Sequence, residues 1–185
     1  MRHHVVGITV IITVIIIITL VAIRSALVFN IRRTIRYLLI DLINEFENEG
    51  VEYWVDFGSL LGIMREKDVI LGDNDGDVCI LHSTTENTKK VGHIVERMGG
   101  RYFDWGAFRV YNGRIFIDIF LVKEDNDEYK PIKKYVHPIV KKTIKLGGCS
   151  LVASLPNKPL DVLKERYGKD WRTPYYKWYF LYFKV

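Results

Sequence analysis

Residues 57–80 read FGSLLGIMREKDVILGDNDGDVCI, and this stretch carries most of the information on the fold. A Gly-Ser turn and an arginine are followed by three aspartates at alternate positions, Asp73, Asp75 and Asp77, and then by the apolar run VCIL. Alternate side chains of an extended chain point the same way, and the apolar run predicts a buried strand. Because clustered carboxylates repel one another unless a cation lies between them, the pattern predicts a metal site for phosphate chemistry, with Mg²⁺ or Mn²⁺ as the ion.

A third carboxylate, Asp118, lies in the apolar stretch IFIDIFLV, which predicts another buried strand. A buried, ionised and unpaired carboxylate costs several kcal/mol, so Asp118 needs a partner. One hypothesis is a metal ion shared with Asp75 and Asp77, which makes these three aspartates the expected metal ligands and catalytic residues. The alternative is a salt bridge to Arg109 or Arg114.

The turn before the aspartates is the expected substrate-binding element. Gly58 lets the backbone turn sharply, and Ser59 with the following helix N-terminus offers N–H donors to a phosphate. Arg65 is placed to neutralise that phosphate, and Asp73 is expected either to support the metal ligands or to take part in substrate binding. A plain strand-to-helix turn and a surface arginine are the alternatives for these residues.

An uncharged apolar segment, Val5–Ile23, precedes this part of the chain. Its nineteen residues span roughly 28 Å as a helix, about the thickness of a bilayer core. A signal peptide has a shorter apolar region and a small-residue cleavage site, so the segment predicts an uncleaved single-pass anchor. We therefore expect a membrane anchor over residues 1–28, in contact with the lipid bilayer, and a catalytic domain over residues 29–185.

Charge next to the anchor bears on its orientation. Four arginines follow it, against Arg2 before it, which favours a cytoplasmic domain by the positive-inside rule. The formal net charge of +5 is modest, and no nucleic-acid partner is expected. The four arginines that follow the anchor are Arg24, Arg32, Arg33 and Arg36.

Hydrophobic periodicity and turn residues predict the remaining elements. An α+β domain with a small mixed sheet and flanking helices follows from their order. The expected elements are helix 35–49, strand 51–57, a short helix to residue 64, strand 78–81, a helix opened by a capping box at Ser83 and Glu86, strands 107–111 and 114–122 joined by Asn112-Gly113, strand and loop over 133–154, a helix from Pro159 to Gly168, and an aromatic-rich segment 170–185.

Four segments, in order, resemble the LicD family, whose relatives include fukutin and the fukutin-related protein. VDFGSLLGIMRE is similar to the family's Gly-Thr/Ser-Leu-Leu-Gly element, and ILGDNDGDVCI to its acidic element. RIFIDIF resembles its later buried aspartate, and LPNKPLDVLKERYGKDWRTP its C-terminal signature. The chain departs from the family where Leu71-Gly72 replace Pro-Trp and where Asn74 and Gly76 interrupt the acidic run.

The resemblance implies a nucleotidyltransferase-like fold and a phosphotransferase that uses a CDP-linked donor. Such an enzyme moves a phospho-alcohol, of the phosphocholine or ribitol 5-phosphate type, to a glycan hydroxyl and releases CMP. Tyr167, Asp170 and Trp171 would then line the acceptor or nucleotide side, or serve in packing. The resemblance also permits a lumenal domain on an endoplasmic reticulum or Golgi membrane in a eukaryote. Transfer of NMP to a small molecule, and an inactive membrane-anchored binding module, are the alternative functions.

Overall fold

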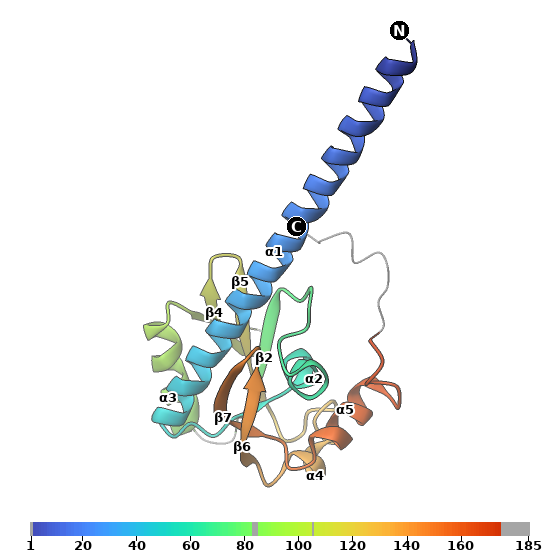
Figure 1. Ribbon diagram of the computed structural model, residues 1–185. Helices are drawn as coiled ribbons and strands as arrows, with labels where there is room; N and C mark the ends of the chain where they lie inside the picture. The colour runs from blue at the N-terminus through green and yellow to red at the C-terminus, as the bar shows by residue number, and fades with distance from the viewer. Residues whose placement is uncertain (1, 83–84, 105, 175–185) are drawn as a thin grey trace.

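A long N-terminal helix leads directly into an α+β domain in the computed structural model, which describes residues 2–82, 85–104 and 106–174 (Figure 1). Ser83 of the expected capping box and residues 175–185 of the aromatic-rich segment lie outside the described residues. The elements are α1 (Arg2–Asn48), β1 (Trp54–Val55), α2 (Phe57–Glu66), β2 (Asp75–Leu81), α3 (Thr85–Arg97), β3 (Arg101–Phe103), β4 (Ala107–Asn112), β5 (Ile115–Val122), α4 (Lys133–Val136), β6 (Val140–Leu146), β7 (Cys149–Leu155) and α5 (Pro159–Tyr167).

The larger sheet has five strands in the order β1-β2-β5-β4-β3. Strands β2 and β5 run parallel, and the other neighbours pair antiparallel, so the sheet is mixed as the sequence predicts. Strands β4 and β5 form the hairpin expected at Asn112-Gly113, with Gly113 at a φ of 64° that suits a glycine. Strands β6 and β7 form a separate antiparallel hairpin.

Helix α1 unites two segments that the sequence analysis treats separately. The chain has neither glycine nor proline from Ile8 to Glu49, so nothing interrupts the helix before Gly50, where φ is +63°. Its side chains from Ile8 to Ile23 are exposed all round, whereas its second half packs against β2, β4, β5 and β7. The core residues of this second half follow helical spacing: Ile35, Leu38, Leu39, Leu42, Ile43 and Phe46.

Strand periodicity separates the two faces of the larger sheet. On β2, Gly76 faces α1, because a Cβ on it would lie 3.5 Å from Cγ2 of Ile35. The residues on either side of Gly76, Asp75 and Asp77, therefore point to the opposite face. Asp118 is paired in register with Asp77 and points to this same face. The sheet thus buries its aliphatic side under α1 and places its aspartates on the other side.

The observed elements differ from the expected ones at four places. The strand expected over residues 51–57 is reduced to Trp54–Val55, and the strand expected over 78–81 begins earlier, at Asp75. Residues 133–154, left open as strand and loop, form α4, β6 and most of β7, with the hairpin turning at Gly147 and Gly148, both at positive φ. Strand β3 was not expected from the sequence.

Candidate active site

A row of three charged residues crosses the centre of the sheet. Asp77 of β2 lies opposite Asp118 of β5, and Asp118 lies opposite Arg109 of β4. Directly paired residues on neighbouring strands point to the same face and come into contact. The register therefore joins two of the three predicted metal ligands, and it adds an arginine that sequence reasoning names only as a possible partner of Asp118.

Asp118 forms a two-point ion pair with Arg109. The guanidinium Nε lies 2.5 Å from Oδ1, and the second nitrogen donates to Oδ2 at 2.9 Å. Both groups are shielded, with side-chain exposures of 8% for Asp118 and 22% for Arg109. Arg109 also stacks on the ring of Phe116, with its Cζ 3.8 Å from the ring centroid. The salt-bridge alternative for Asp118 is thus present in this conformation, through Arg109.

The Gly58-Ser59 turn is fastened to the acidic strand. The Gly58 N–H donates to Oδ2 of Asp77 at 3.0 Å, and the Asp77 N–H donates to Oγ of Ser59 at 2.8 Å. A Cβ on Gly58 would lie 3.1 Å from Oδ2 of Asp77 and 3.4 Å from Oδ2 of Asp73. The absent side chain of Gly58 therefore lets the turn approach two carboxylates at once.

Burial and mutual repulsion make the carboxylates easier to protonate. Burial, followed by the charges of neighbouring carboxylates, raises the pKa of Asp77 to about 7. Burial and the charge of Asp75 raise the pKa of Asp73 to about 6. Burial and the charge of Asp118 also raise the pKa of Asp75. Each shift reports a cost of holding negative charge at this place, which a bound cation would relieve.

The donor chemistry of these residues fits a hard divalent cation, since carboxylate oxygens are the ligands that Mg²⁺ and Mn²⁺ prefer. Among the described residues, no group of three His, Cys, Asp or Glu side chains is arranged to hold a metal ion as it stands. Asp118 directs both oxygens at Arg109. Rotation of Asp75 or Asp118 about its side-chain bonds would be needed to complete a set with Asp77.

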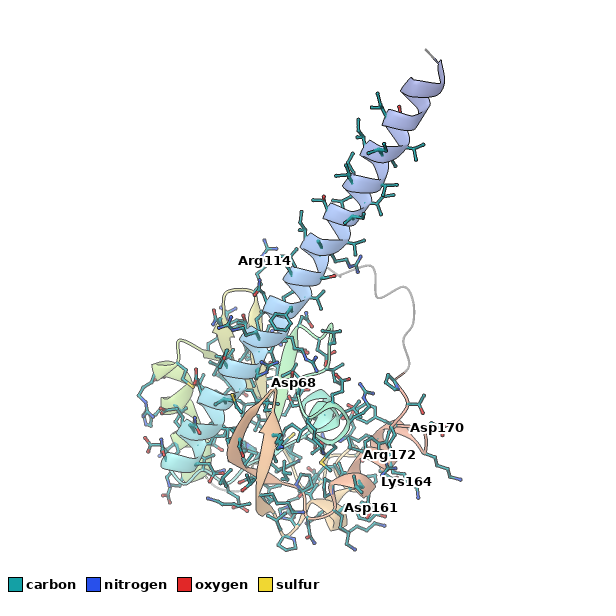
Figure 2. All side chains as sticks on the ribbon, in the orientation of Figure 1. Asp68, Arg114, Asp161, Lys164, Asp170 and Arg172 are labelled. Atoms are coloured by element: carbon teal, nitrogen blue, oxygen red, sulfur yellow. The ribbon has the colours of Figure 1, made fainter. Side chains whose placement is uncertain are left out.

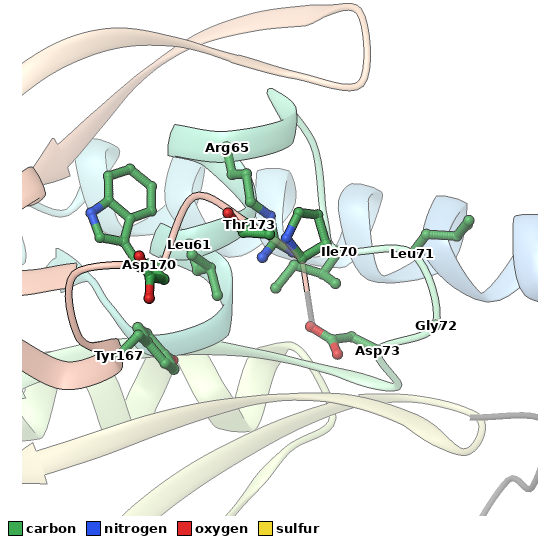
Figure 3. A pocket seen from close by; sticks show the side chains of 11 residues that line it. Leu61, Arg65, Ile70, Leu71, Gly72, Asp73, Tyr167, Asp170 and Thr173 are labelled. Carbon is green, nitrogen blue, oxygen red and sulfur yellow. The ribbon is translucent and has the colours of Figure 1, made fainter. Parts of the chain in front are cut away.

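A cavity of about 660 Å³ opens beside Asp73, the first of the clustered aspartates. Figure 3 shows Arg65, Asp73 and Tyr167 on different sides of it. Arg65 donates to Glu66 at 2.8 Å, but its buried Nε has no hydrogen-bond partner within the described part of the chain. Because this Nε is buried, the Arg65 side chain would have to turn before the Nε could donate to an anion in the cavity. The other lining residues are Leu61, Ile70, Leu71, Gly72, Asp170, Trp171, Thr173 and Pro174.

A buried pair beneath the turn was missed by sequence reasoning. Asp56 is fully buried and caps α2 by accepting from the Phe57 N–H at 2.8 Å. Arg166 of α5 donates to both of its oxygens, at 2.9 Å and 2.7 Å, and stacks on the Phe57 ring with its Cζ 3.9 Å from the centroid. Trp54 donates to Asp56 as well, at 2.9 Å. An aspartate placed before a helix is a capping signal, but it does not name its distant partner.

The predicted site residues thus fall into three groups. Asp73 and Asp77 meet at Gly58, and Asp75 is close enough for its charge to raise the pKa of both. Asp118 adjoins Asp77 but is paired with Arg109. The side chain of Ser59 holds the backbone of Asp77, and the last predicted residue, Arg65, lines the cavity together with Asp73.

Comparisons with known proteins agree with this arrangement. The profile of the family described as "LicD/FKTN/FKRP, nucleotidyltransferase domain" matches residues 50–144, which include the turn, the acidic strand and Asp118. Two uncharacterised proteins of Rickettsia are similar. RP689 of Rickettsia prowazekii is 27% identical over 82 residues, which are 43% of this chain and 30% of that protein. RT0683 of Rickettsia typhi is 26% identical over 80 residues, which are 43% of this chain and 26% of that protein. The matched part therefore spans less than a third of either relative.

Two solved structures of the antibiotic-resistance factor ANT(2'')-Ia are also similar. The solution structure has a TM-score of 0.41 and 20% identity, covering 52% of this chain and 51% of that one. The crystal structure in complex with adenylyl-2''-tobramycin has a TM-score of 0.44 and 16% identity, covering 65% and 69%. These likenesses are too weak to bear on the reaction. The family match covers more than half of the chain, and the chain belongs to the LicD/FKTN/FKRP family, with its nucleotidyltransferase domain at residues 50–144.

Proposed function

We propose that this chain is a membrane-anchored, divalent-metal-dependent phosphotransferase. It moves a phospho-alcohol, of the phosphocholine or ribitol 5-phosphate type, from a CDP-linked donor to the hydroxyl of a glycan. The observation that carries this proposal is the cluster of carboxylates Asp73, Asp75 and Asp77, adjoined by Asp118 and bordered, at Asp73, by a cavity that Arg65 also lines. Membership of the family supports the transferase class.

In this proposal Asp75, Asp77 and Asp118 would hold one or two Mg²⁺ or Mn²⁺ ions, whose charge would neutralise the diphosphate of the donor. Arg65 binds a phosphate oxygen with its guanidinium, after a turn of the side chain that brings the buried Nε to the cavity, and Asp73 borders the same cavity. The acceptor hydroxyl forms a bond to the distal phosphorus as the bond to CMP breaks. Asp118 orients that hydroxyl and takes its proton, after releasing at least one oxygen from Arg109.

The nucleoside of the donor fits the apolar part of the cavity. Trp171, which is 6% exposed, and Tyr167 present aromatic surface there. Nucleotides are commonly held by apolar and aromatic walls with a few convergent polar groups. Burial, followed by the charge of Asp77, raises the pKa of Tyr167 to about 12, so its hydroxyl stays a neutral donor and acceptor at physiological pH. The hydroxyl can therefore donate to a phosphate or sugar oxygen.

The test uses the full chain in detergent micelles with Mg²⁺ and with CDP-choline, CDP-ribitol or CDP-glycerol in turn. We expect CMP release with one of these donors, its loss in EDTA, and its return with Mg²⁺ or Mn²⁺. Asp75→Ala and Asp77→Ala should abolish release. Asp127→Ala, which removes the same charge from a side chain that is 99% exposed, is the matched control and should be active. Full turnover in both site variants would refute the proposal.

Product analysis separates the proposal from its alternatives. A nucleotidyltransferase would leave the nucleotide on the acceptor instead of releasing CMP. This alternative is supported by the family's domain, which is a nucleotidyltransferase domain. An inactive binding module would release nothing and would give no metal-dependent heat with CDP-choline in calorimetry. Release of CMP together with a phospho-alcohol on the acceptor supports the phosphotransferase alone.

We also propose that the chain is a single-pass membrane protein, with residues 1–28 as the anchor and 29–185 as the catalytic domain. One helix of the described part is long and apolar enough to cross a membrane, and its apolar window is not buried at all. The arginines after the anchor favour a cytoplasmic domain, and a lumenal domain in the endoplasmic reticulum or Golgi is the alternative. Protease protection of residues 29–185 in sealed microsomes distinguishes the two orientations.

A further inference from the structure

The apolar anchor and the domain core are parts of one unbroken helix. The exposed apolar residues of α1 continue past Ile23 to Leu27 and Phe29, which are 56% and 59% exposed. Ile35, the first fully buried residue among the described side chains of α1, follows soon after. A helix without glycine or proline has no point at which it bends easily. The domain therefore lies at a nearly constant distance from the end of the anchor. Its height above the bilayer is therefore fixed by the length of α1.

That height is small. Ile35 is five residues beyond Asn30 and twelve beyond Ile23, so it stands roughly 8 to 18 Å past the apolar segment at 1.5 Å per residue. Ile35 is also level with the acidic strand, because Gly76 of β2 lies against it. Asp75 and Asp77 flank that glycine on the other face of the strand. The carboxylates therefore lie near the height at which lipid head groups end.

The active site also occupies the end of the sheet that faces the anchor. Figure 2 shows Arg114, in the β4–β5 turn, beside α1 on the side from which its apolar half emerges. Strand β5 begins directly after Arg114, and β2 runs parallel to it with Asp75 opposite Phe116. The aspartates are thus at the membrane-proximal end of β2. Asp161 of α5 lies toward the opposite end of the domain in the same view.

Basic side chains surround this end of the domain. Arg33 on α1 and Arg114 in the β4–β5 turn are exposed, and Arg24 is half-buried beside the apolar segment. Arg32 and Arg36 brace the loop after α2, since Arg32 donates to the Val69 carbonyl at 2.6 Å and Arg36 pairs with Asp68. Exposed arginines close to a bilayer favour anionic head groups, which would draw this face toward the membrane.

We infer that the acceptor hydroxyl belongs to a head group carried by a lipid in the same bilayer, so that transfer occurs at the membrane surface. This inference rests on the proposed phosphotransferase function and names its acceptor class: a membrane lipid with a hydroxylated, sugar-bearing head. A site held within a few head-group lengths of the bilayer meets lipid-borne acceptors at a high effective concentration. Donor binding from the aqueous phase is unaffected, because CDP-alcohols are soluble.

The position of the site is tested without activity, by fluorescence transfer to a dye on lipid head groups. The chain is reconstituted into phosphatidylcholine vesicles, with Cys149→Ser removing the half-buried thiol and Cys79 left in place because it is fully buried. A donor dye is placed at Arg114→Cys or, as the matched distal site, at Asp161→Cys. We expect clearly stronger transfer from position 114 than from 161. Equal transfer from both would overturn the inference.

The acceptor class is tested by lengthening the helix. Seven or fourteen helix-forming residues inserted after Phe29 raise the domain by about 10 or 21 Å with little rotation. The acceptors are dioleoylglyceryl glycosides of glucose, galactose and N-acetylglucosamine in the vesicles, compared with the methyl glycosides of the same sugars in solution. The control carries the same seven residues between His3 and His4, beyond the other end of the apolar segment.

We expect the native chain to use the lipid glycosides roughly 100-fold better than the methyl glycosides at equal bulk concentration. The longer insertion should remove about tenfold of that preference, while donor hydrolysis by water and the N-terminal control stay unchanged. Equal use of both acceptor types, no effect of helix length, or hydrolysis without transfer to either would each overturn the inference. Failure of the proposed function is distinct: it appears as absent or Asp75-independent donor turnover.

Discussion

Arg166 of α5 donates two hydrogen bonds, of 2.9 and 2.7 Å, to the carboxylate of Asp56. Asp56 caps α2 directly before the Gly58-Ser59 turn. Asp56 is fully buried, and the Arg166 side chain is 12% exposed, so both charges are largely shielded from solvent. The pair connects segments 110 positions apart in the chain. The pair therefore holds in place the turn whose Gly58 N–H donates to Asp77. Neither Asp56 nor Arg166 lines the cavity beside Asp73.

Arg166→Met should destabilise the protein by about 3–5 kcal/mol, because it leaves the Asp56 carboxylate buried and unpaired. The measurement is thermal unfolding of the full chain in micelles, followed by circular dichroism. Adding Asp56→Asn to Arg166→Met should restore part of the lost stability, since the amide oxygen still caps α2 without a charge. If the Arg166→Met variant had the same Tm as the native chain, this account of the pair would be contradicted.

The pH dependence of stability follows from the raised carboxyl pKa values. Asp77 and Asp73 have pKa values of about 7 and about 6 in the folded chain, above the ordinary value of 3.8. Between pH 4 and 7 the folded state thus binds more protons than the unfolded state, so stability falls as pH rises. We expect the metal-free chain to have a higher Tm at pH 5 than at pH 8.

Asp77→Asn is the control for the pH dependence of Tm, because Asp77 has a higher pKa than Asp73 and the substitution removes its carboxyl group. The difference in Tm between pH 5 and pH 8 should shrink in this variant, and 5 mM Mg²⁺ at pH 8 should raise the Tm of the native chain but not that of the variant. A native Tm that rises steadily from pH 5 to pH 8 in EDTA would show that other groups dominate.

Gly58→Ala should reduce donor turnover about 100-fold, because the new Cβ would lie 3.1 Å from Oδ2 of Asp77 and displace that carboxylate. The matched control is Gly92→Ala in α3, where the nearest atom to the new Cβ is 3.8 Å away. That substitution should leave turnover unchanged and stabilise the helix by about 0.5–1 kcal/mol. Comparable activity in the two variants would mean that the close approach of Gly58 is not needed.

Arg109→Gln tests whether Arg109 competes with a cation for Asp118. The substitution removes the ion pair but keeps a polar side chain, so Asp118 becomes free to turn toward Asp77. We expect a lower Tm in EDTA, since a shielded carboxylate loses its partner, together with tighter Mn²⁺ binding in calorimetry. Weaker Mn²⁺ binding than in the native chain would indicate that Arg109 positions Asp118 for the ion instead of competing with it.

Local signals in the sequence predicted much of this architecture. The Asn112-Gly113 pair predicted the β4–β5 hairpin, and the apolar run after the aspartates predicted β2, although that strand begins earlier, at Asp75, because turn chemistry and strand periodicity depend on near neighbours. Strands β6 and β7 were not resolved as a hairpin, since β6 exposes several lysines and buries only Ile144 and Leu146, which leaves a weak pattern.

The remaining part of the site depends on distant pairing. The sequence names Arg109 as one of two possible partners of Asp118, but only the register of β4 with β5 selects it over Arg114. Arg166 could not be assigned to Asp56, because any of several arginines could pair with a buried carboxylate that lies so far away in the chain. Long-range pairing is decided by the packing of whole elements, which local sequence patterns do not contain.

Because the second half of α1 belongs to the domain core and precedes every strand in the chain, its apolar face is synthesised before the residues that cover it. Leu39 and Phe46 leave the ribosome early, but they are covered only when the strands and α3, which follow them in the chain, have been made. During that interval the second half of α1 carries an uncovered apolar stripe. The nascent chain thus has a defined window in which chaperones would bind it, and that window closes with the synthesis of β7.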